Sequence, residues 1–216
     1  MMATLRIRGL AICADFSEED IRRVYQPCYS VFVILEYRML QASLKPQDVL
    51  VLAKLVTGHG RRPTMAQLAL ELGLSSSQVH GSLKRLEKSR LVAAVADGGR
   101  PIVHAVEEFL IYGLKYVFPA QRGEVTRGIP TAHAAPPLNR HFPAGDGLPP
   151  VWPDPNGDAR GTSVDPLHKM VPVAVRKDPA LYELLSLIET LRDGRARERQ
   201  LAERELATRL RRLLHG

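Results

Sequence analysis

The feature that most restricts the fold of this sequence is a pair of matched helix starts. Thr64 is followed three residues later by Gln67, and Ser75 is followed in the same way by Gln78. In each pair the hydroxyl can accept a backbone N–H while the glutamine reaches back to the first residue, which is a capping box. Gly73, between the two, can adopt a positive φ without strain. The sequence therefore predicts two short helices joined by a tight turn, a helix-turn-helix.

Apolar residues recur at helical spacing in these two helices and in one before them, which starts near Leu44 with Pro46 in its first turn. Each predicted helix thus has one face to bury against the others. The apolar faces are Val49, Leu50, Leu52, Ala53 and Val56 in the first helix, Leu68, Ala69 and Leu72 in the second, and Val79, Leu83 and Leu86 in the third.

A β-hairpin is predicted directly after the third helix. Leu91–Val95 would form one strand and Ile102–Val103 the other, with a turn at Asp97, Gly98 and Gly99. Pro101 would keep the returning strand at an edge. A helix over Val106–Tyr116 would follow the hairpin. The expected fold class is mainly α with a small β wing.

The outward face of the third helix is the candidate functional surface. At 100° per residue the outward side chains are Ser77, Gln78, Gly81, Lys84, Arg85 and Lys88, none of them acidic. Such a face suits the phosphates and base edges of a major groove about 12 Å wide. The candidate DNA-binding residues are Ser75, Ser76, Ser77 and Gln78 near the helix start, Gly81 in its middle, Thr64, Lys84, Arg85 and Lys88 as phosphate contacts, and Arg100 at the hairpin tip.

Three of these residues also have a purely structural interpretation. The role of Gln78 in the capping box would compete with hydrogen bonds to a base. Gly81 either lets the helix backbone approach the groove closely or leaves room for packing inside the protein. Arg100 either reaches the DNA backbone or minor groove, or is a solvated arginine in a turn.

Positive charge is concentrated in the same part of the chain. The net charge is +7, and residues 40–103 hold nine basic and four acidic side chains. Basic charge gathered on one module indicates a polyanionic partner. The chain lacks a signal-peptide pattern and any apolar run of about 18 residues, and its two cysteines are too few for a disulfide framework, so we expect a cytoplasmic protein.

The run from Leu44 to Val92, including PTMAQLALELGLSSSQVHGSLKRLEKSRLV, resembles winged helix-turn-helix regulators of the MarR-like superfamily. The resemblance implies a homodimer on a pseudo-palindromic site in double-stranded DNA, with terminal helices at the dimer interface. We therefore expect a transcriptional regulator that docks Ser75–Lys88 in the major groove. No catalytic, phosphate-binding or metal-binding motif stands out, so we expect no enzyme, no cofactor and no metal site.

The remaining segments have less definite patterns. We expect an N-terminal helical extension at 1–43, with a helix capped by Ser17, the winged helix at 44–118, a Pro-rich extended segment at 119–178 and a C-terminal helical pair at 179–216 for dimerisation or partner contact. A natural start at or near Met39 is an alternative for the first segment, because the clear patterns begin only at Leu44.

Residues 119–179 hold twelve of the sixteen prolines, so regular structure should be largely excluded there. This segment is either a linker or an extended segment wrapped on the folded body. We favour the second, because it contains Ile129, Leu138, Phe142, Leu148, Val151, Trp152 and Leu167.

The two final helices present leucines to a core or to a partner. The run RDGRARERQ is either a solvated helix face or a second contact for nucleic acid or a partner. The competing function is an antitoxin-like or adaptor protein that clamps a partner protein with its Pro-rich and C-terminal segments.

Overall fold

The structure is a computed structural model that describes residues 6–7, 10–11, 43–58, 63–95, 99–142 and 147–212. The chain divides into two units, Met1–Ser43 and Leu44–Gly216. In the first unit, strand β1 (Arg6–Ile7) pairs antiparallel with strand β2 (Leu10–Ala11). The helix expected from Ser17, the turn residues Asp97 and Gly98, and the leucines Leu213 and Leu214 lie outside the described residues.

The predicted helix-turn-helix is present. Helix α2 (Pro46–Thr57) precedes α3 (Met65–Leu72) and α4 (Ser76–Lys88). Both capping boxes form, at Thr64 and at Ser75, and the apolar faces of the three helices pack together in the core. Local capping chemistry and helical periodicity therefore predict these elements correctly.

The wing is shorter than the sequence suggests. Val92 and Pro101 form a single antiparallel bridge, and the Ala93 N–H donates to the Arg100 carbonyl at 2.8 Å. Val103, expected in the returning strand, instead begins helix α5 (Val103–Glu108). Pro101 has no N–H to extend the ladder, so pairing stops and the chain turns into the helix.

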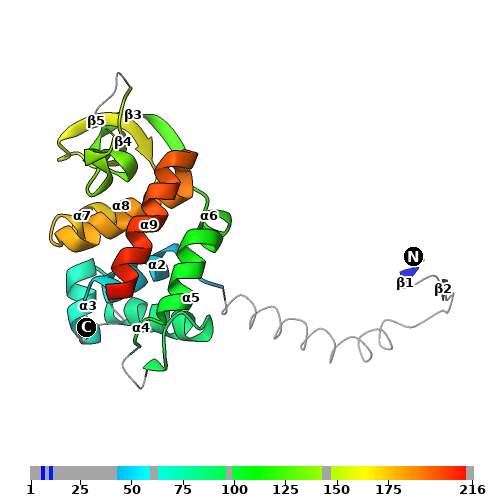
Figure 1. Ribbon diagram of the computed structural model, residues 1–216. Coiled ribbons are helices and arrows are strands. Elements are labelled where there is room, and N and C mark those ends of the chain that lie inside the picture. The colour runs from blue at the N-terminus through cyan, green and yellow to red at the C-terminus, as the bar shows by residue number, and fades with distance from the viewer. Residues whose placement is uncertain are drawn as a thin grey trace, which may run out of the picture. The chain divides into compact units, whose positions relative to one another are not determined.

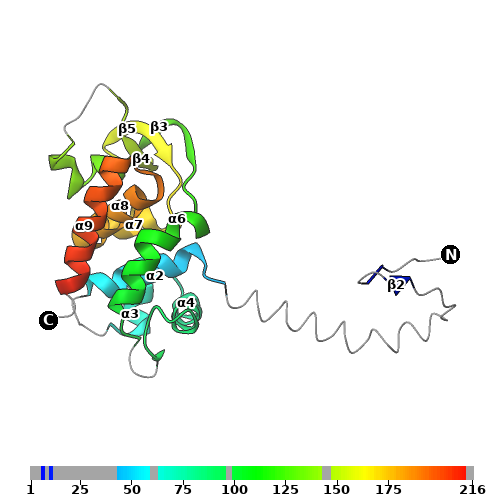
Figure 2. The same cartoon turned by 45° about the vertical axis from the view of Figure 1, so that its right-hand side comes forward.

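The helix expected over Val106–Tyr116 after the wing is present, but its middle is irregular. After α5 comes the π-helical turn η2 (Phe109–Gly113), followed by α6 (Leu114–Val117). The Leu114 N–H donates to the Phe109 carbonyl, five residues back, as a π-helical turn requires. Figures 1 and 2 show this helix running alongside the last helix of the chain, α9 (Ala196–Arg212).

The Pro-rich segment contains a small β-sheet, which corrects the expectation that its prolines largely exclude regular structure. Strand β3 (Arg122–Pro130) pairs antiparallel with both β4 (Pro150–Pro153) and β5 (Ala159–Val164), and β4 and β5 are parallel, so the three strands close on one another. The prolines stand at strand ends, where a missing N–H costs little. At Gly161 a Cβ would overlap the Pro149 carbonyl oxygen, so this close approach requires glycine. Two 3₁₀ turns, η3 (Ala132–Ala134) and η4 (Leu138–Arg140), link β3 to β4.

Apolar side chains of the Pro-rich segment lie in the core, as expected for a wrapped segment. Leu138, Val151, Trp152 and Leu167 are all buried. The Trp152 ring lies 6.1 Å from the ring of Tyr182, measured between centroids. Leu148 differs, because 54% of it is exposed.

Helix α8 (Pro179–Asp193) forms the centre of the second unit. Asp178 caps it by accepting the N–H groups of Ala180 and Leu181, and every residue from Leu184 to Leu191 is buried. The helix packs against α2, α6, α9, η3 and the short helix α7 (Val171–Val175). Its leucines therefore face the core of the same chain. Figures 1 and 2 show α8 between the helix-turn-helix at one end and the sheet at the other.

A buried arginine fixes the start of the Pro-rich segment to α8. The Arg192 guanidinium donates to the carbonyls of Phe118 (2.8 Å) and Pro119 (3.2 Å) and pairs with Glu189 at 2.5 Å. Burial raises the pKa of Glu189 to about 7, although the charge of Arg192 opposes this shift. Among the described helices, none is long and apolar enough to cross a membrane.

Candidate DNA-binding surface

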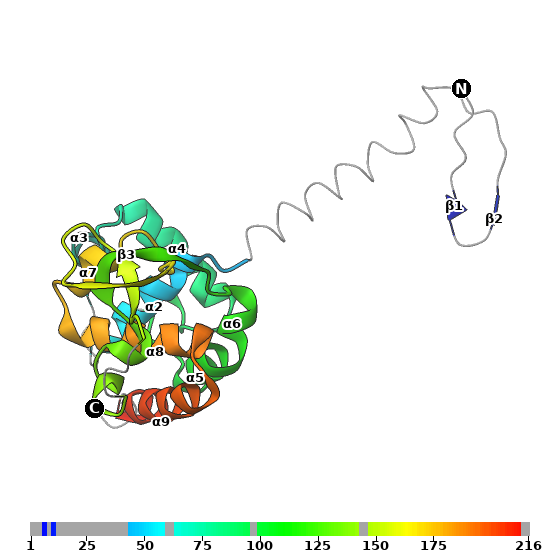
Figure 3. The same cartoon turned by 90° about the horizontal axis from the view of Figure 1, so that it is seen from above.

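One side of helix α4 is exposed and the opposite side is buried. Val79, Leu83 and Leu86 are at most 5% exposed and attach the helix to α2 and α3. Viewed from the end in Figure 3, α3 and α4 lie together at one side of the second unit, away from α9. This arrangement holds α4 firmly while leaving its outer side free for a ligand.

The structure leaves most of the predicted site residues accessible. Thr64, Ser75, Ser76, Ser77, Gln78, Lys84, Lys88 and Arg100 are exposed, whereas Gly81 and Arg85 are half-buried. Among the described residues, neither Lys84 nor Lys88 has an ion-pair partner. Their charges are available to an external anion.

Arg85 does not point outward, which corrects the sequence-based orientation. Its guanidinium makes two hydrogen bonds to the Asp48 carboxylate, 2.7 Å from Nε and 2.6 Å from Nη2. The Arg85 side chain is 16% exposed and that of Asp48 is fully buried. Asp48 also accepts the Lys45 N–H at 2.8 Å in the first turn of α2. This bidentate pair joins α2 to α4 and sets how α4 lies on the core.

The half-buried position of Gly81 has a packing explanation. A Cβ there would lie 3.3 Å from Nη1 of Arg85, tighter than most side-chain contacts. Because Asp48 holds the guanidinium in place, the missing side chain of Gly81 leaves room for this ion pair. This supports the internal-packing interpretation of the glycine.

The capping residues use part of their hydrogen-bonding capacity inside the protein. Gln78 accepts the Ser75 N–H through its Oε1 atom at 2.9 Å, and its own N–H donates to the Ser75 hydroxyl at 3.2 Å. Gln67 and Thr64 make the same two bonds at the start of α3. Gln78 thus keeps only its amide NH₂ free for a base, so reading adenine through both amide atoms would break the cap.

His80 belongs to the exposed surface, although sequence reasoning did not select it. It is exposed on α4 and stands four residues before Lys84, which stands four residues before Lys88. Together with Ser77 these residues form one row along the helix, which we call the α4 stripe. The i, i+4 spacing to the two lysines is the signal that could have identified His80.

Residues from the C-terminal part of the chain pack against the helix-turn-helix and its turn. Gly73 has φ +65°, and a Cβ there would overlap the end of the Met170 side chain. Lys54 pairs with Glu71 (2.6 Å) and with the α8 cap Asp178 (2.7 Å). Burial alone would lower the pKa of Lys54, but hydrogen bonds and the charges of these two carboxylates outweigh burial and raise it. Helices α2, α3 and α8 therefore meet at one ionic junction.

Comparison with known proteins identifies the segment that contains the α4 stripe. No curated protein and no solved structure matches the chain. Residues 42–100, which span α2, α3, α4 and the start of the wing, match the sequence model of the MarR family. The resemblance in the sequence to MarR-like winged helices is thereby confirmed for this part of the chain.

Proposed function

We propose that this protein is a transcriptional regulator that binds duplex DNA through helix α4. The observation that carries the proposal is the α4 stripe, because its exposed side chains offer positive charge and hydrogen-bond donors without an exposed acid. A recognition helix of a helix-turn-helix presents such a face to the major groove. The match of residues 42–100 to the MarR family supports the same function.

The proposed roles follow from position along α4. Ser76, Ser77 and the free amide of Gln78 stand near the helix start, where recognition helices contact base edges. Lys84 and Lys88, one and two turns further on, hold phosphates and fix the register of the helix on the duplex. These assignments separate residues that read sequence from residues that only position the protein.

The other predicted residues act around the edge of this contact. Ser75 and Thr64 hold the two helix starts and present their exposed hydroxyls to the backbone, and Arg100 reaches the backbone or minor groove beside the wing. Arg85 is a positioning residue, because its guanidinium is bound to Asp48. His80 adds a donor between the two groups.

An adaptor that clamps a partner protein is less well supported. Such a protein would need apolar surface on its Pro-rich and C-terminal segments. Leu138, Trp152 and the leucines of α8 are instead buried against the core of the same chain. Most of the apolar side chains that an adaptor would present to a partner protein are therefore buried within this chain.

We further propose that the protein binds as a homodimer on a pseudo-palindromic site. The leucines of α8 cannot provide the interface, since they are buried within the unit. Tyr112, Tyr116 and Val117 are 66%, 78% and 51% exposed on the helix that leaves the wing. The two tyrosines, four residues apart, share a face of suitable chemistry for contact with a second copy.

Selection of bound fragments from genomic DNA by the full-length protein tests the proposed function. The expected result is recovery of a recurring, pseudo-palindromic sequence, with an affinity for it that falls steeply as salt concentration rises. Recovery of no recurring sequence, together with no salt-dependent binding to any duplex, would show that the α4 stripe does not bind DNA.

A further inference from the structure

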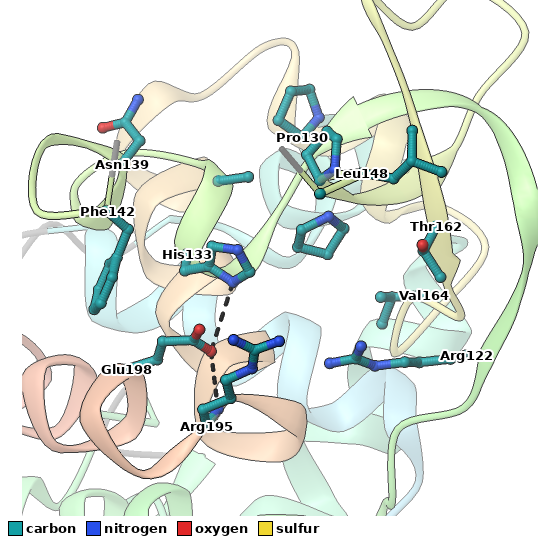
Figure 4. Close-up of a pocket in the computed structure, with 14 residues that line it drawn as sticks. Arg122, Pro130, His133, Asn139, Phe142, Leu148, Thr162, Val164, Arg195 and Glu198 are labelled. Carbon is teal, nitrogen blue, oxygen red and sulfur yellow. Dashed lines mark hydrogen bonds and ion pairs between the residues drawn. The ribbon is translucent and has the colours of Figure 1, made fainter. Parts of the chain in front are cut away.

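The end of the second unit that lies away from the helix-turn-helix contains a pocket of about 740 Å³. It lies between the small sheet, the 3₁₀ turns η3 and η4, and the start of α9 (Figure 4). This volume is within the range of roughly 300–1,000 Å³ that is usual for small-molecule sites. All of its lining residues lie outside 42–100, so an inference about the pocket does not depend on DNA binding.

Two arginines turn their charged groups toward the same side of this pocket. Figure 4 shows the guanidinium groups of Arg122 and Arg195 facing one another. Arg122 is bound through Nε to Asp193 at 2.6 Å, whereas the side chain of Arg195 has no ion-pair or hydrogen-bond partner among the described residues. Asp193 offsets the charge of Arg122, so the Arg195 guanidinium stands beside it as a positive charge without a partner among the described residues.

Among the described lining residues, the one acid, Glu198, is already committed to other partners. Glu198 is 7% exposed, accepts the Arg195 backbone N–H at 2.8 Å and lies 3.6 Å from Nδ1 of His133. It therefore fixes the start of α9 and orients the histidine, and it does not neutralise the Arg195 guanidinium. The side of the pocket at the two arginines is left positive.

Apart from His133, Asn139 and Thr162, the rest of the described pocket wall is apolar, and it contains three prolines. The apolar side chains that line it are Pro130, Ala134, Phe142, Leu148, Pro149, Pro150 and Val164. Leu148 is 54% exposed although it is a large apolar side chain. The three prolines have little backbone freedom to lose, which lowers the entropic cost of binding.

From this arrangement we infer that the pocket binds a small organic anion with an apolar body. Its carboxylate lies between Arg122 and Arg195, where two guanidinium groups supply charge-assisted hydrogen bonds. Its hydrocarbon part packs on Phe142, Leu148 and the prolines. The sequence left open whether the run RDGRARERQ is a solvated face or a contact, and this inference makes its Arg195 a ligand contact.

Octanoate and 1-octanol are a suitable pair of probes, because they share a hydrocarbon chain and differ in charge. Trp152, the only tryptophan of the chain, is fully buried and does not line the pocket, so binding is measured by calorimetry and not by fluorescence. Isothermal titration calorimetry of the full-length protein should give a binding curve that saturates with octanoate. Binding of 1-octanol should be about tenfold weaker.

Three variants separate the two halves of the site. Arg195→Gln should weaken octanoate binding about tenfold and leave 1-octanol unchanged. Arg197→Gln is the matched control, because it removes the same charge from an exposed position of α9 that does not line the pocket, and it should change neither. Leu148→Ser should weaken both ligands by a similar factor.

The inference is overturned if octanoate does not bind, or if it binds no more tightly than 1-octanol. It is also overturned if Arg195→Gln and Arg197→Gln have the same effect, since that would indicate general attraction to a basic surface. Arg195 is exposed, so its substitution should leave the thermal unfolding midpoint unchanged, and this control ensures that a loss of binding is not a loss of folding.

Discussion

Replacing Arg85 by methionine distinguishes a structural role for this residue from a direct contact with DNA. The substitution leaves the Asp48 carboxylate fully buried, with the Lys45 N–H as its one remaining donor among the contacts described above. Loss of one partner from a buried ion pair costs about 3–5 kcal/mol. Since domains of this size are stable by roughly 5–15 kcal/mol, the loss should be large.

The assay is urea unfolding followed by far-UV circular dichroism, with Asp48→Asn and the double variant completing the cycle. In the double variant the buried charge is gone, and asparagine can still accept the Lys45 N–H. We therefore expect the double variant to be more stable than Arg85→Met alone by about 2 kcal/mol. A double variant that is more stable than Arg85→Met alone would show that Asp48 and Arg85 stabilise the fold as an interacting pair.

The same Arg85→Met protein should also be tested for DNA binding at several salt concentrations. If its guanidinium is bound to Asp48, the slope of log K against log salt should equal that of the wild type. A slope lower by about one unit, with unchanged stability, would refute this reasoning and make Arg85 a phosphate contact.

Two further predictions concern other parts of the second unit. Burial raises the pKa of Glu189 from 4.5 to about 7, so the folded protein retains a proton that the unfolded chain has lost between these values. The resulting stabilisation is complete below pH 4.5 and is lost as the pH rises to about 7. Over this range the free energy of unfolding, measured by urea unfolding, should fall by about 3 kcal/mol more in the wild type than in Glu189→Gln. An equal pH dependence in the variant would contradict this. Tyr116→Asp should convert a dimer to a monomer in light scattering coupled to size-exclusion chromatography, and a wild-type protein that is already monomeric would exclude the proposed interface.

The helix-turn-helix could be predicted because its signals are local. A capping box such as Ser75 with Gln78 is complete within one turn of helix, and the apolar spacing of α4 selects its buried side directly. Gly73 likewise marks a left-handed turn that only a few residue types accept. These features need no knowledge of the rest of the chain.

The orientation of Arg85 could not be predicted in the same way. Periodicity gives the angle at which its Cα–Cβ bond leaves α4, but a long side chain can fold back over the helix surface. Its partner Asp48 is 37 residues earlier, and nothing in the spacing connects the two.

The sheet in the Pro-rich segment was missed because its pairing is not local. β3 pairs with β4 and β5 across the intervening turns, so no short window of sequence contains β3 together with either partner strand. Proline content argues against strands in general, but here Pro130, Pro150 and Pro153 occupy strand ends. Position within the strand, which composition does not report, decides whether proline is tolerated.

The salt dependence of DNA binding by a Lys84→Ala, Lys88→Ala double variant tests the central claim most directly. Both lysines are exposed on the α4 stripe without an ion-pair partner among the described residues, so their removal should leave stability unchanged. The account predicts that the slope of log K against log salt falls by about two units, while a variant with Arg197 and Arg211 replaced by alanine keeps the wild-type slope. An unchanged slope for the lysine variant, or an equal fall for the α9 variant, would contradict the claim that α4 lies against the DNA backbone.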